Sequence, residues 1–332
     1  MSALGEFNKL DPMSLLDSME QAMGVGFTGL VTPLPSYINR VYEVEDETGR
    51  KLVAKFYRPG RWTVSAIEEE HQFLEDCALD EIPVILPVQL TNGSTIAYIG
   101  DIPFSVFPKK GGRLFELNTD MDYVRVGSLI GRIHLAGKKR KAENRVVLHP
   151  QYALKKDIDY LAESGAIPDS KKMQFMDICR KIKERITPLF ENVFLQRIHG
   201  DCHRGNILDR GGDEGLNIID FDDMAIGPKI HDLWMLLPSR LSESKPELSL
   251  MLEGYNNFSK LDPGTIRLVE PLRAMRIIYF LAWSARQRGD HSFKEHHPNW
   301  GTEQFWEQEI HDLKLQYSEI EDSLDMDINM IL

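Results

Sequence analysis

The first third of the chain alternates between apolar and polar residues in a way typical of β-strands. Residues 38–45 and 51–57 each alternate with a period of two, and a glycine-containing turn at 46–50 separates them, so the pattern predicts a β-hairpin. Further strands are predicted at 94–99 and 102–107. An amphipathic helix at 13–23, capped by Asp11-Pro12, precedes the hairpin, and the stretch 24–35 is expected to end that helix before the strands begin.

A second helix, predicted at 65–79, has a carboxylate on its apolar side. Placed at 100° per residue, Ile67, Phe73 and Leu74 share one face, and Glu70 falls near the middle of it. A carboxylate that faces a core is costly unless it is paired. Lys55, on the preceding strand, is the expected partner.

The rest of the chain is mostly helical by the same criteria, so the sequence predicts an α+β fold. The smaller, β-rich lobe is assigned to residues 1–108 and the larger, helical lobe to 109–332, with a hinge at 108–112. The acidic tail, 319–332, is expected to fray. Helices are predicted at 121–135, 155–163, 170–190, 246–258, 265–287 and 302–317, and short strands at 194–198, 205–208 and 216–219.

Charge and cysteine usage narrow the class of partner. The 332 residues include 39 Lys and Arg against 51 Asp and Glu, a net charge of −12, which repels nucleic acid and anionic membranes. The three cysteines lack the spacing of a zinc or redox site, and the N-terminus has no signal-peptide pattern. We therefore expect a cytoplasmic protein, a monomer, with neither nucleic acid nor membrane as its partner.

The most specific motif is His199-Gly-Asp201-Cys-His-Arg-Gly-Asn206, followed by Ile218-Ile-Asp220. This order of Asp, Asn and Asp is typical of kinases, where the three residues serve as base, metal ligand and metal ligand. A carboxylate can orient and accept the proton of an attacking hydroxyl, which suits Asp201. The hard oxygens of Asn206 and Asp220 suit Mg²⁺. The alternative is an ordinary loop in which Asp201 caps a turn, and the full spacing argues against it.

Neighbouring residues allow chemical and structural interpretations. His199 and His203 lack a third metal ligand, so hydrogen bonding that shapes the loop is favoured over a metal site. Cys202 is interpreted as a packed thiol, because no separate base supports a nucleophile. Asp232 is either a brace beneath the catalytic loop or a helix N-cap.

Two arginines on the long helix at 265–287 also remain open. Arg273 and Arg276 lie three residues apart and could contact a substrate acid or phosphate. The favoured alternative is that both are cations extending from the edge of a core. The sequence pattern assigns no role to Asp222 or Asp223.

The His-Gly-Asp-x-x-x-x-Asn and Ile-Asp-Phe-Asp pieces resemble the aminoglycoside phosphotransferase and choline kinase superfamily, whose members have a two-lobed, protein-kinase-like fold. Within that superfamily, the chain resembles the bacterial stress response kinase A family. The matching pieces run in order from about residue 30 to residue 285. They are Ser36-Tyr-Ile-Asn39, Ala54-Lys55-Phe-Tyr-Arg-Pro-Gly-Arg-Trp62, Glu69-Glu70-His-Gln-Phe, Phe107-Pro, His231-Asp-Leu-Trp and Glu270-Pro-Leu-Arg-Ala-Met-Arg276.

The resemblance implies a cytoplasmic serine/threonine protein kinase that uses ATP and Mg²⁺ in stress responses. It implies that Asp201 is the proton acceptor, that Asn206 and Asp220 are metal ligands and that Asp220 is a second catalytic carboxylate. Ser36 would lie at the ATP site. The Lys55–Glu70 pair would hold the α- and β-phosphates, and backbone near Phe107 would meet adenine.

Some kinase features are missing from the sequence. The turn at 34–40 has no G-x-G-x-x-G, so Ser36 and nearby backbone amides would have to cover the phosphates. Residues 131–138 resemble a P-loop only superficially, because the glycine spacing is too long. The stretch between Asp220 and Asp232 is too short for an activation segment.

Three functions therefore compete. The first is a protein kinase that phosphorylates Ser or Thr. The second is a small-molecule kinase acting on an amino alcohol, aminoglycoside, homoserine or sugar hydroxyl, since the same residues serve both substrate classes. The third is a pseudokinase that binds nucleotide as a switch, and the presence of Lys55, Asp201, Asn206 and Asp220 argues against it.

Overall fold

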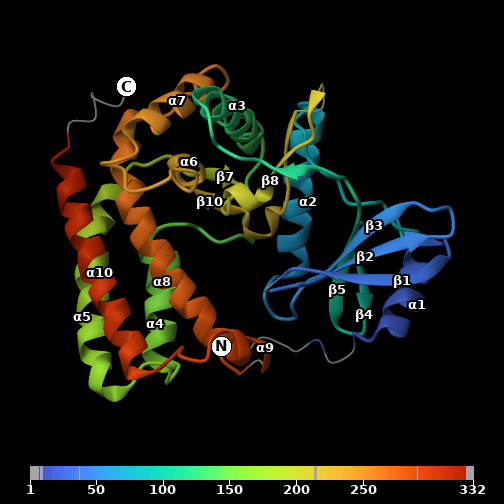
Figure 1. The fold of residues 1–332 in the computed structure, drawn as a ribbon, viewed down its shortest axis with the longest axis horizontal. Coiled ribbons are helices and arrows are strands. Elements are labelled where there is room, and N and C mark those ends of the chain that lie inside the picture. Colours follow the sequence, from blue (N-terminus) through green and yellow to red (C-terminus); the bar gives the residue numbers. More distant parts are fainter. Residues whose placement is uncertain (1–6, 8–9, 37, 213–214, 290, 327–332) are drawn as a thin grey trace. The chain divides into compact units, whose positions relative to one another are not determined.

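The computed structural model describes residues 7, 10–36, 38–212, 215–289 and 291–326, and these form two compact units (Figure 1). The first unit contains Met1–Phe115, Ala142–Asn144 and Gly205–Asp222. The second contains Glu116–Lys141, Arg145–Arg204 and Asp223–Leu332. The assignment of lobes to 1–108 and 109–332 stays a prediction, whereas the α+β class with a small antiparallel sheet and a larger helical part is confirmed.

The first unit is built on a five-stranded antiparallel sheet in the order β1-β2-β3-β5-β4. The hairpin of β2 (Arg40–Asp46) and β3 (Lys51–Phe56) confirms the predicted pair of strands, as do β4 (Ala97–Ile99) and β5 (Ile102–Pro108). The stretch 24–35 ends the first helix as predicted, but the expectation that the strands begin only after it was wrong, because β1 (Phe27–Leu34) lies within it. β1 is an edge strand with an irregular register, and an edge position tolerates Gly29 and Pro33.

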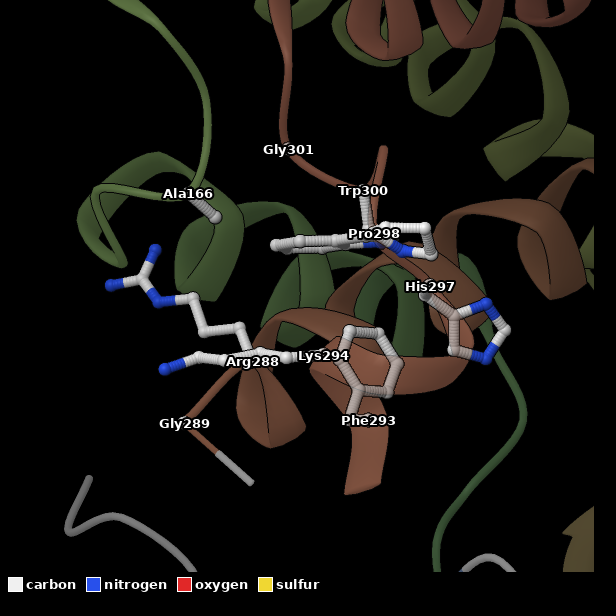
Figure 2. A pocket seen from close by; sticks show the side chains of 9 residues that line it. All are labelled: Ala166, Arg288, Gly289, Phe293, Lys294, His297, Pro298, Trp300 and Gly301. Carbon is white, nitrogen blue, oxygen red and sulfur yellow. The ribbon is translucent and has the colours of Figure 1, made fainter. Parts of the chain in front are cut away.

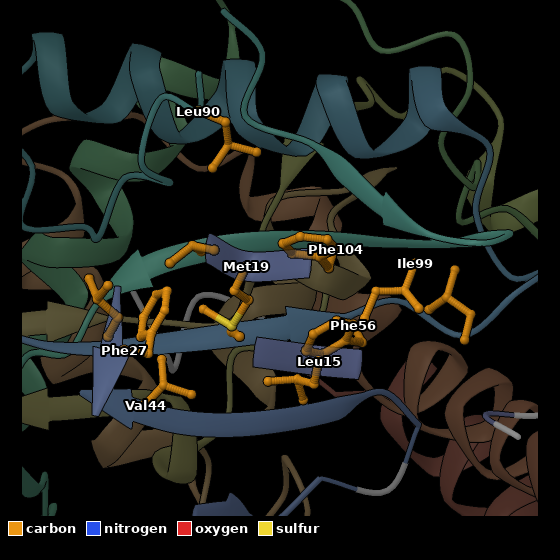
Figure 3. Close-up of a cluster of buried hydrophobic side chains, with 12 residues drawn as sticks. Leu15, Met19, Phe27, Val44, Phe56, Leu90, Ile99 and Phe104 are labelled. Atoms are coloured by element: carbon orange, nitrogen blue, oxygen red, sulfur yellow. The ribbon is translucent and has the colours of Figure 1, made fainter. Parts of the chain in front are cut away.

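The helix predicted at 13–23 is present as α1 (Pro12–Met23), and it packs on one face of this sheet (Figure 3). Leu15 and Met19 from the helix are fully buried with Phe56 and Phe104 from the sheet, whose rings lie 5.0 Å apart. The Asp11 side chain accepts hydrogen bonds from the first turn of the helix, and Gly24 ends it in the left-handed conformation. This core fixes β3 and hence the position of Lys55.

The first unit also contains α2 (Val64–Leu79) and a small sheet in the order β6-β8-β9. The strands of this sheet are β6 (Arg113–Leu114), β8 (Ile207–Asp209) and β9 (Leu216–Ile218). After β9, Phe221 packs edge-on against Phe73 of α2 at 5.4 Å. The predicted strands at 205–208 and 216–219 thus belong to the first unit, next to the helix that carries Glu70.

The second unit is mainly helical and holds a two-stranded sheet of β7 (Gln196–Ile198) and β10 (Ala225–Gly227). The sequence analysis missed β10, β6 and α9, which are short. The helices are α3 (Asp120–Gly137), α4 (Lys155–Glu163), α5 (Asp169–Ile186), α6 (Ile230–Trp234), α7 (Lys245–Tyr255), α8 (Val269–Gln287), α9 (His291–His296) and α10 (Glu303–Leu324).

Four predicted helix boundaries were wrong, one of them in the helix expected at 246–258, which ends at Tyr255. The helix expected at 170–190 ends at Ile186 and continues as a 3-10 turn, and a 3-10 segment, Pro263–Leu268, precedes α8. The expected fraying from residue 319 does not occur up to Leu324, because Ile320 and Ser323 are buried; residues 327–332 lie outside the described part. Within the described residues, no helix is both long and apolar enough to cross a membrane.

Candidate active site

The β8–β9 hairpin places two of the predicted metal ligands at the same end. Asn206 directly precedes β8 and Asp220 follows β9, and the strands pair antiparallel with Ile207 opposite Ile218. The Ile219 N–H donates to the Asn206 carbonyl at 2.9 Å, which extends the pairing to that end. Asn206 is buried, whereas the Asp220 side chain is 53% exposed.

Asp220 has an uncommon backbone conformation for its residue type, with φ of +62°. Non-glycine residues adopt this region rarely, and they do so more often at functional sites than elsewhere. One carboxylate and one amide oxygen source at one hairpin end form a donor set that fits Mg²⁺, which takes few protein ligands and keeps waters and phosphate oxygens. The residues present therefore fit the metal that the sequence implies.

Lys55 lies at the centre of a cluster of charges in the first unit, in which Glu70 and Asp222 are buried. Its Nζ is 3.3 Å from Glu70 Oε1, which confirms the predicted pair, and 3.2 Å from Asp220 Oδ1. It also lies 3.1 Å from Asp222 Oδ1. Burial works against the charged amine, but Asp222, Glu70 and Asp220 together raise the pKa of Lys55 well above its ordinary value.

The sequence analysis left Asp222 without a role, and the structure places it beside Lys55. Arg61 forms a second ion pair with Asp222, and the Arg61 guanidinium also lies over the Trp62 ring, 5.1 Å from its centroid. The sequence offered one signal for Asp222, its position directly after the apolar Phe221, which is buried at the start of a 3-10 turn in the structure. That signal gives the direction of a side chain but not which cation it meets.

Asp201 lies on the loop after β7, in the second unit, and its backbone is held from beneath. The carboxylate of Asp232 accepts from the backbone N–H of His199 at 2.7 Å and of Gly200 at 2.9 Å. Asp232 is therefore the predicted brace and not an N-cap. His231 Nε2 lies 3.1 Å from the Gly200 carbonyl, so both sides of this residue are fixed.

Gly200 is required at this position for two reasons. Its φ is +83°, and a Cβ would lie 2.1 Å from the Asp223 carbonyl oxygen. The glycine thus lets the loop pass close to the start of β10. The consequence is a fixed direction for the next residue, Asp201.

Two basic side chains face the Asp201 carboxylate. Arg276 of α8 donates to Oδ1, and His203 Nε2 lies 3.5 Å from Oδ2. Burial would raise the pKa of Asp201, but the His203 hydrogen bond and the Arg276 charge outweigh it and lower that pKa below its ordinary value of 3.8. Asp201 is thus ionised at neutral pH. The sequence analysis favoured a cation extending from the edge of a core over one that contacts substrate; the Arg276 side chain is partly exposed, and its ion pair with Asp201 was not predicted.

The remaining residues of this loop have structural contacts. The Asp201 N–H donates to His199 Nδ1 at 3.3 Å, as expected for a histidine that shapes the loop. Cys202 is fully buried, and burial raises the pKa of its thiol well above the ordinary value, which fits a packed thiol. Arg273 donates hydrogen bonds to Glu270 and to the Ser239 carbonyl. These contacts direct its guanidinium to partners other than Asp201.

Two predicted nucleotide-site residues lie in the first unit, away from the charge cluster in sequence. Ser36 is half-buried between β1 and β2, next to residue 37, which lies outside the described part. Phe107 is in β5 and packs edge-on against His71, with ring centroids 6.2 Å apart. β4 pairs with residues 102–104 of β5, so Phe107 lies beyond that paired stretch. The superficial P-loop at 131–138 falls within α3 and its C-cap.

A hollow of about 480 Å³ lies in the second unit around α9, and none of the predicted site residues lines it (Figure 2). Trp300 and Pro298 lie on one side of it and Phe293 on the other. The remaining lining residues are Ala166, Arg288, Gly289, Lys294, His297 and Gly301. This hollow is therefore separate from the residues that carry the motif.

The family profile and the related proteins described here are all phosphotransferases or kinases. The profile of the phosphotransferase enzyme family matches residues 30–267. Stress response kinase A of Salmonella typhi is 37% identical over 304 residues, which is 91% of this chain and 91% of that protein. Stress response kinase A of Escherichia coli K12 is 38% identical over 90% of each chain, and the similar protein of Salmonella typhimurium, 37% identical over 91% of each, is named serine/threonine protein kinase RdoA.

Solved structures show the same fold at low identity. The amicoumacin kinase hAmiN has a TM-score of 0.74 at 18% identity, covering 98% of both chains. A microcompartment-associated aminopropanol kinase has a TM-score of 0.70 at 16% identity, covering 93% of this chain and 98% of that one. The fold and the motif define a kinase-like phosphotransferase. The chain belongs to the phosphotransferase enzyme family, in the group of stress response kinase A, so the family resemblance seen in the sequence is confirmed.

Proposed function

We propose that this phosphotransferase transfers the γ-phosphate of ATP to Ser or Thr hydroxyls of a protein, with Mg²⁺ as its metal. The observation that carries the proposal is the Lys55 cluster, in which one ammonium meets Glu70 and Asp220 at 3.3 and 3.2 Å. This is the pairing that kinases use to hold nucleotide phosphates beside a metal-binding carboxylate. The solved structure of amicoumacin kinase is a complex with AMP-PNP and Ca²⁺, which supports a nucleotide and a divalent ion.

In this proposal, each predicted site residue of the first unit contributes to binding the nucleotide or its metal. Lys55 binds the α- and β-phosphates, and Glu70 keeps its ammonium in place. Asn206 and Asp220 would hold the metal, which neutralises charge on the phosphates when it is bound. Ser36 and its backbone would cover the phosphates, and the β5 backbone beyond β4, at Phe107, would meet adenine.

Asp201 acts on the acceptor. Because its pKa lies below the ordinary value, it is ionised and accepts a hydrogen bond from the attacking hydroxyl, which orients the oxygen toward phosphorus. A weak base suffices here because the phosphoryl transition state is loose and little proton transfer precedes bond breaking. Gly200, held by Asp232 and His231, keeps the carboxylate in that orientation.

Protein is the proposed acceptor because relatives sharing over a third of their residues with this chain include one named as a serine/threonine protein kinase. A second candidate is a small hydroxyl compound. It is supported by the solved structures, which include kinases of amicoumacin and aminopropanol. The two candidates share the residues that bind nucleotide and differ only in the acceptor.

The acceptor class is tested with γ-labelled ATP and MgCl₂. One arm contains a mixture of unphosphorylated proteins, and a second contains choline, ethanolamine, homoserine and an aminoglycoside. We expect acid-stable label on protein that hydrolyses to phosphoserine or phosphothreonine, either on the added proteins or on the chain itself, and no label with EDTA. Asp201→Asn protein, purified identically, reports contaminating kinases. Label that appears only on a small alcohol would establish the second candidate instead.

A further inference from the structure

α8 carries a stripe of side chains that begins at the catalytic loop. At 100° per residue, Arg276, Tyr279, Phe280 and Trp283 fall within an arc of about 100° on this helix. The opposite side, with Ile278, Leu281 and Ala285, is buried in the second unit. The four residues of the stripe, called here the α8 stripe, are all at least partly exposed.

At the aromatic end of the α8 stripe, two rings stack on each other on the partly exposed side of the helix. The rings of Phe280 and Trp283 stack with centroids 5.3 Å apart and an angle of 21° between their planes. Phe280 is 53% exposed. Ile278 and Leu281 already anchor the helix to the core, and the exposed part of the Phe280 ring leaves apolar surface in water.

The other end of the α8 stripe meets the proposed base. Arg276 forms an ion pair with the Asp201 carboxylate, and the Tyr279 hydroxyl lies 3.5 Å from Asp223 Oδ1. Phe280 and Trp283 follow Arg276 by four and seven residues, which is a distance of about 6 to 10 Å along the helix axis. An extended peptide covers that distance in about two or three residues.

We propose that Phe280 and Trp283 form a specificity subsite for an apolar side chain of the acceptor protein, two or three residues away from the Ser or Thr that is phosphorylated. The inference rests on the proposed function and adds the sequence context of the acceptor. Stacked rings favour aromatic and branched aliphatic side chains. The Arg276 charge, between the rings and Asp201, disfavours a quaternary ammonium, which the same rings would otherwise bind.

The test uses peptides in which a single Ser is flanked by alanines, with Leu or Phe placed at one of the positions two or three residues to either side. For the best of these peptides, Phe280→Ala and Trp283→Ala should each raise KM about tenfold or more, because removing an aromatic anchor weakens binding. The KM for ATP and the kcat should stay near those of the wild type. The all-alanine peptide should be a poor substrate for every variant.

Two further variants separate recognition from structure. Trp283→Phe should restore most of the affinity for the apolar peptide, because it keeps a flat ring. Phe194→Ala is the matched control, since Phe194 is 66% exposed and precedes β7, seven residues before Asp201. It should behave as the wild type, and an unchanged melting temperature would show that the variants fold.

The outcomes distinguish the subsite from the proposed function. If peptides are phosphorylated but apolar neighbours and the two alanine variants make no difference, the subsite is refuted and the proposed function stands. If no peptide is phosphorylated and choline is, with a higher KM for choline in Trp283→Ala, both proposals fail and the rings recognise an ammonium ion.

Discussion

A single buried histidine links the stability of the loop that carries Asp201 to pH. His231 is 3% exposed, and Trp234 Nε1–H donates to its Nδ1 at 3.3 Å, which leaves Nε2–H to donate to the Gly200 carbonyl. Burial lowers the pKa of His231 to about 4 from an ordinary value of 6.5. The ring must stay neutral to accept from Trp234, so the loop depends on the uncharged form.

Acidification should therefore weaken the fold through His231. The unfolded chain binds a proton below pH 6.5 and the folded chain only near pH 4, so the contribution to stability is complete above pH 6.5 and is lost as the pH falls toward 4. These two pKa values correspond to about 2 kcal/mol lost by pH 5. Urea unfolding at pH 7 and pH 5 should show this loss in the wild type and a smaller one in His231→Gln.

His311→Gln is the matched control, because His311 is exposed on α10, and it should follow the wild type. An equal loss of stability in His231→Gln and in the wild type would contradict the assignment of His231 as a neutral, buried group.

Residue pairs could be predicted where the sequence fixes the direction of a side chain. Helical periodicity placed Glu70 on an apolar face, and strand alternation placed Lys55 between large neighbours, so their pairing followed. Asp222 and Arg276 were not predicted, because their partners depend on tertiary packing that no local pattern records. Arg276 in particular looks, on its helix, like any cation at the edge of a core.

At the scale of elements, the close packing of α3 against α7 depends on glycines. A Cβ on Gly127 would lie 2.0 Å from the Met251 carbonyl oxygen, and one on Gly254 would lie 1.9 Å from that of Val124. Backbone atoms cannot move aside as the end of a flexible side chain can. The Tyr255 hydroxyl at the end of α7 lies 3.0 Å from His134 Nδ1 on α3, and His134 Nε2 in turn contacts Asp232.

Gly127→Ala should therefore destabilise the protein even though alanine favours helix by about 1 kcal/mol. Separating α3 from α7 should cost about 3 kcal/mol, the upper range for an overpacked contact. Chemical denaturation measures this loss. Gly111→Ala is the control, because nothing lies within 4 Å of the position that its Cβ would take. The stability of this variant should equal that of the wild type. A Gly127→Ala protein as stable as the control would show that these helices can separate freely.

Elements were predictable where periodicity was long and uninterrupted, as in α2, α4 and the β2–β3 hairpin. β1 was missed because Gly29 and Pro33 are local signals against a strand, and pairing with β2 overrides them at the sheet edge. The C-terminal extension of α10 was missed because acidic residues suggested solvent, whereas Ile320 and Ser323 are buried. Short elements such as β10 and α9 have too few residues for a periodic signal.

For the whole molecule, the proposed chemistry divides between the two units. The first holds Lys55, Glu70, Asn206 and Asp220, which would bind nucleotide and metal, and the second holds Asp201, which would act on the acceptor. The motif predicted Asp201, Asn206 and Asp220, and the periodic patterns of a strand and a helix predicted Lys55 and Glu70. Their roles stay predictions, because they concern a nucleotide and an acceptor that bind from outside the chain.

This division predicts that Asp201 serves transfer and Asp220 serves binding. The most direct measurement compares, in the same preparations, the Kd for ATP in MgCl₂ by calorimetry and the rate of label transfer from γ-labelled ATP. Asp201→Asn should bind ATP with a Kd near that of the wild type and transfer phosphate about 10² to 10⁴ times more slowly. Asp220→Ala should lose the Mg²⁺-dependent part of binding itself, while Asp177→Asn on the surface of α5 should match the wild type in both. Equal loss of binding in the Asp201 and Asp220 variants, or transfer by Asp201→Asn at the wild-type rate, would contradict the claim.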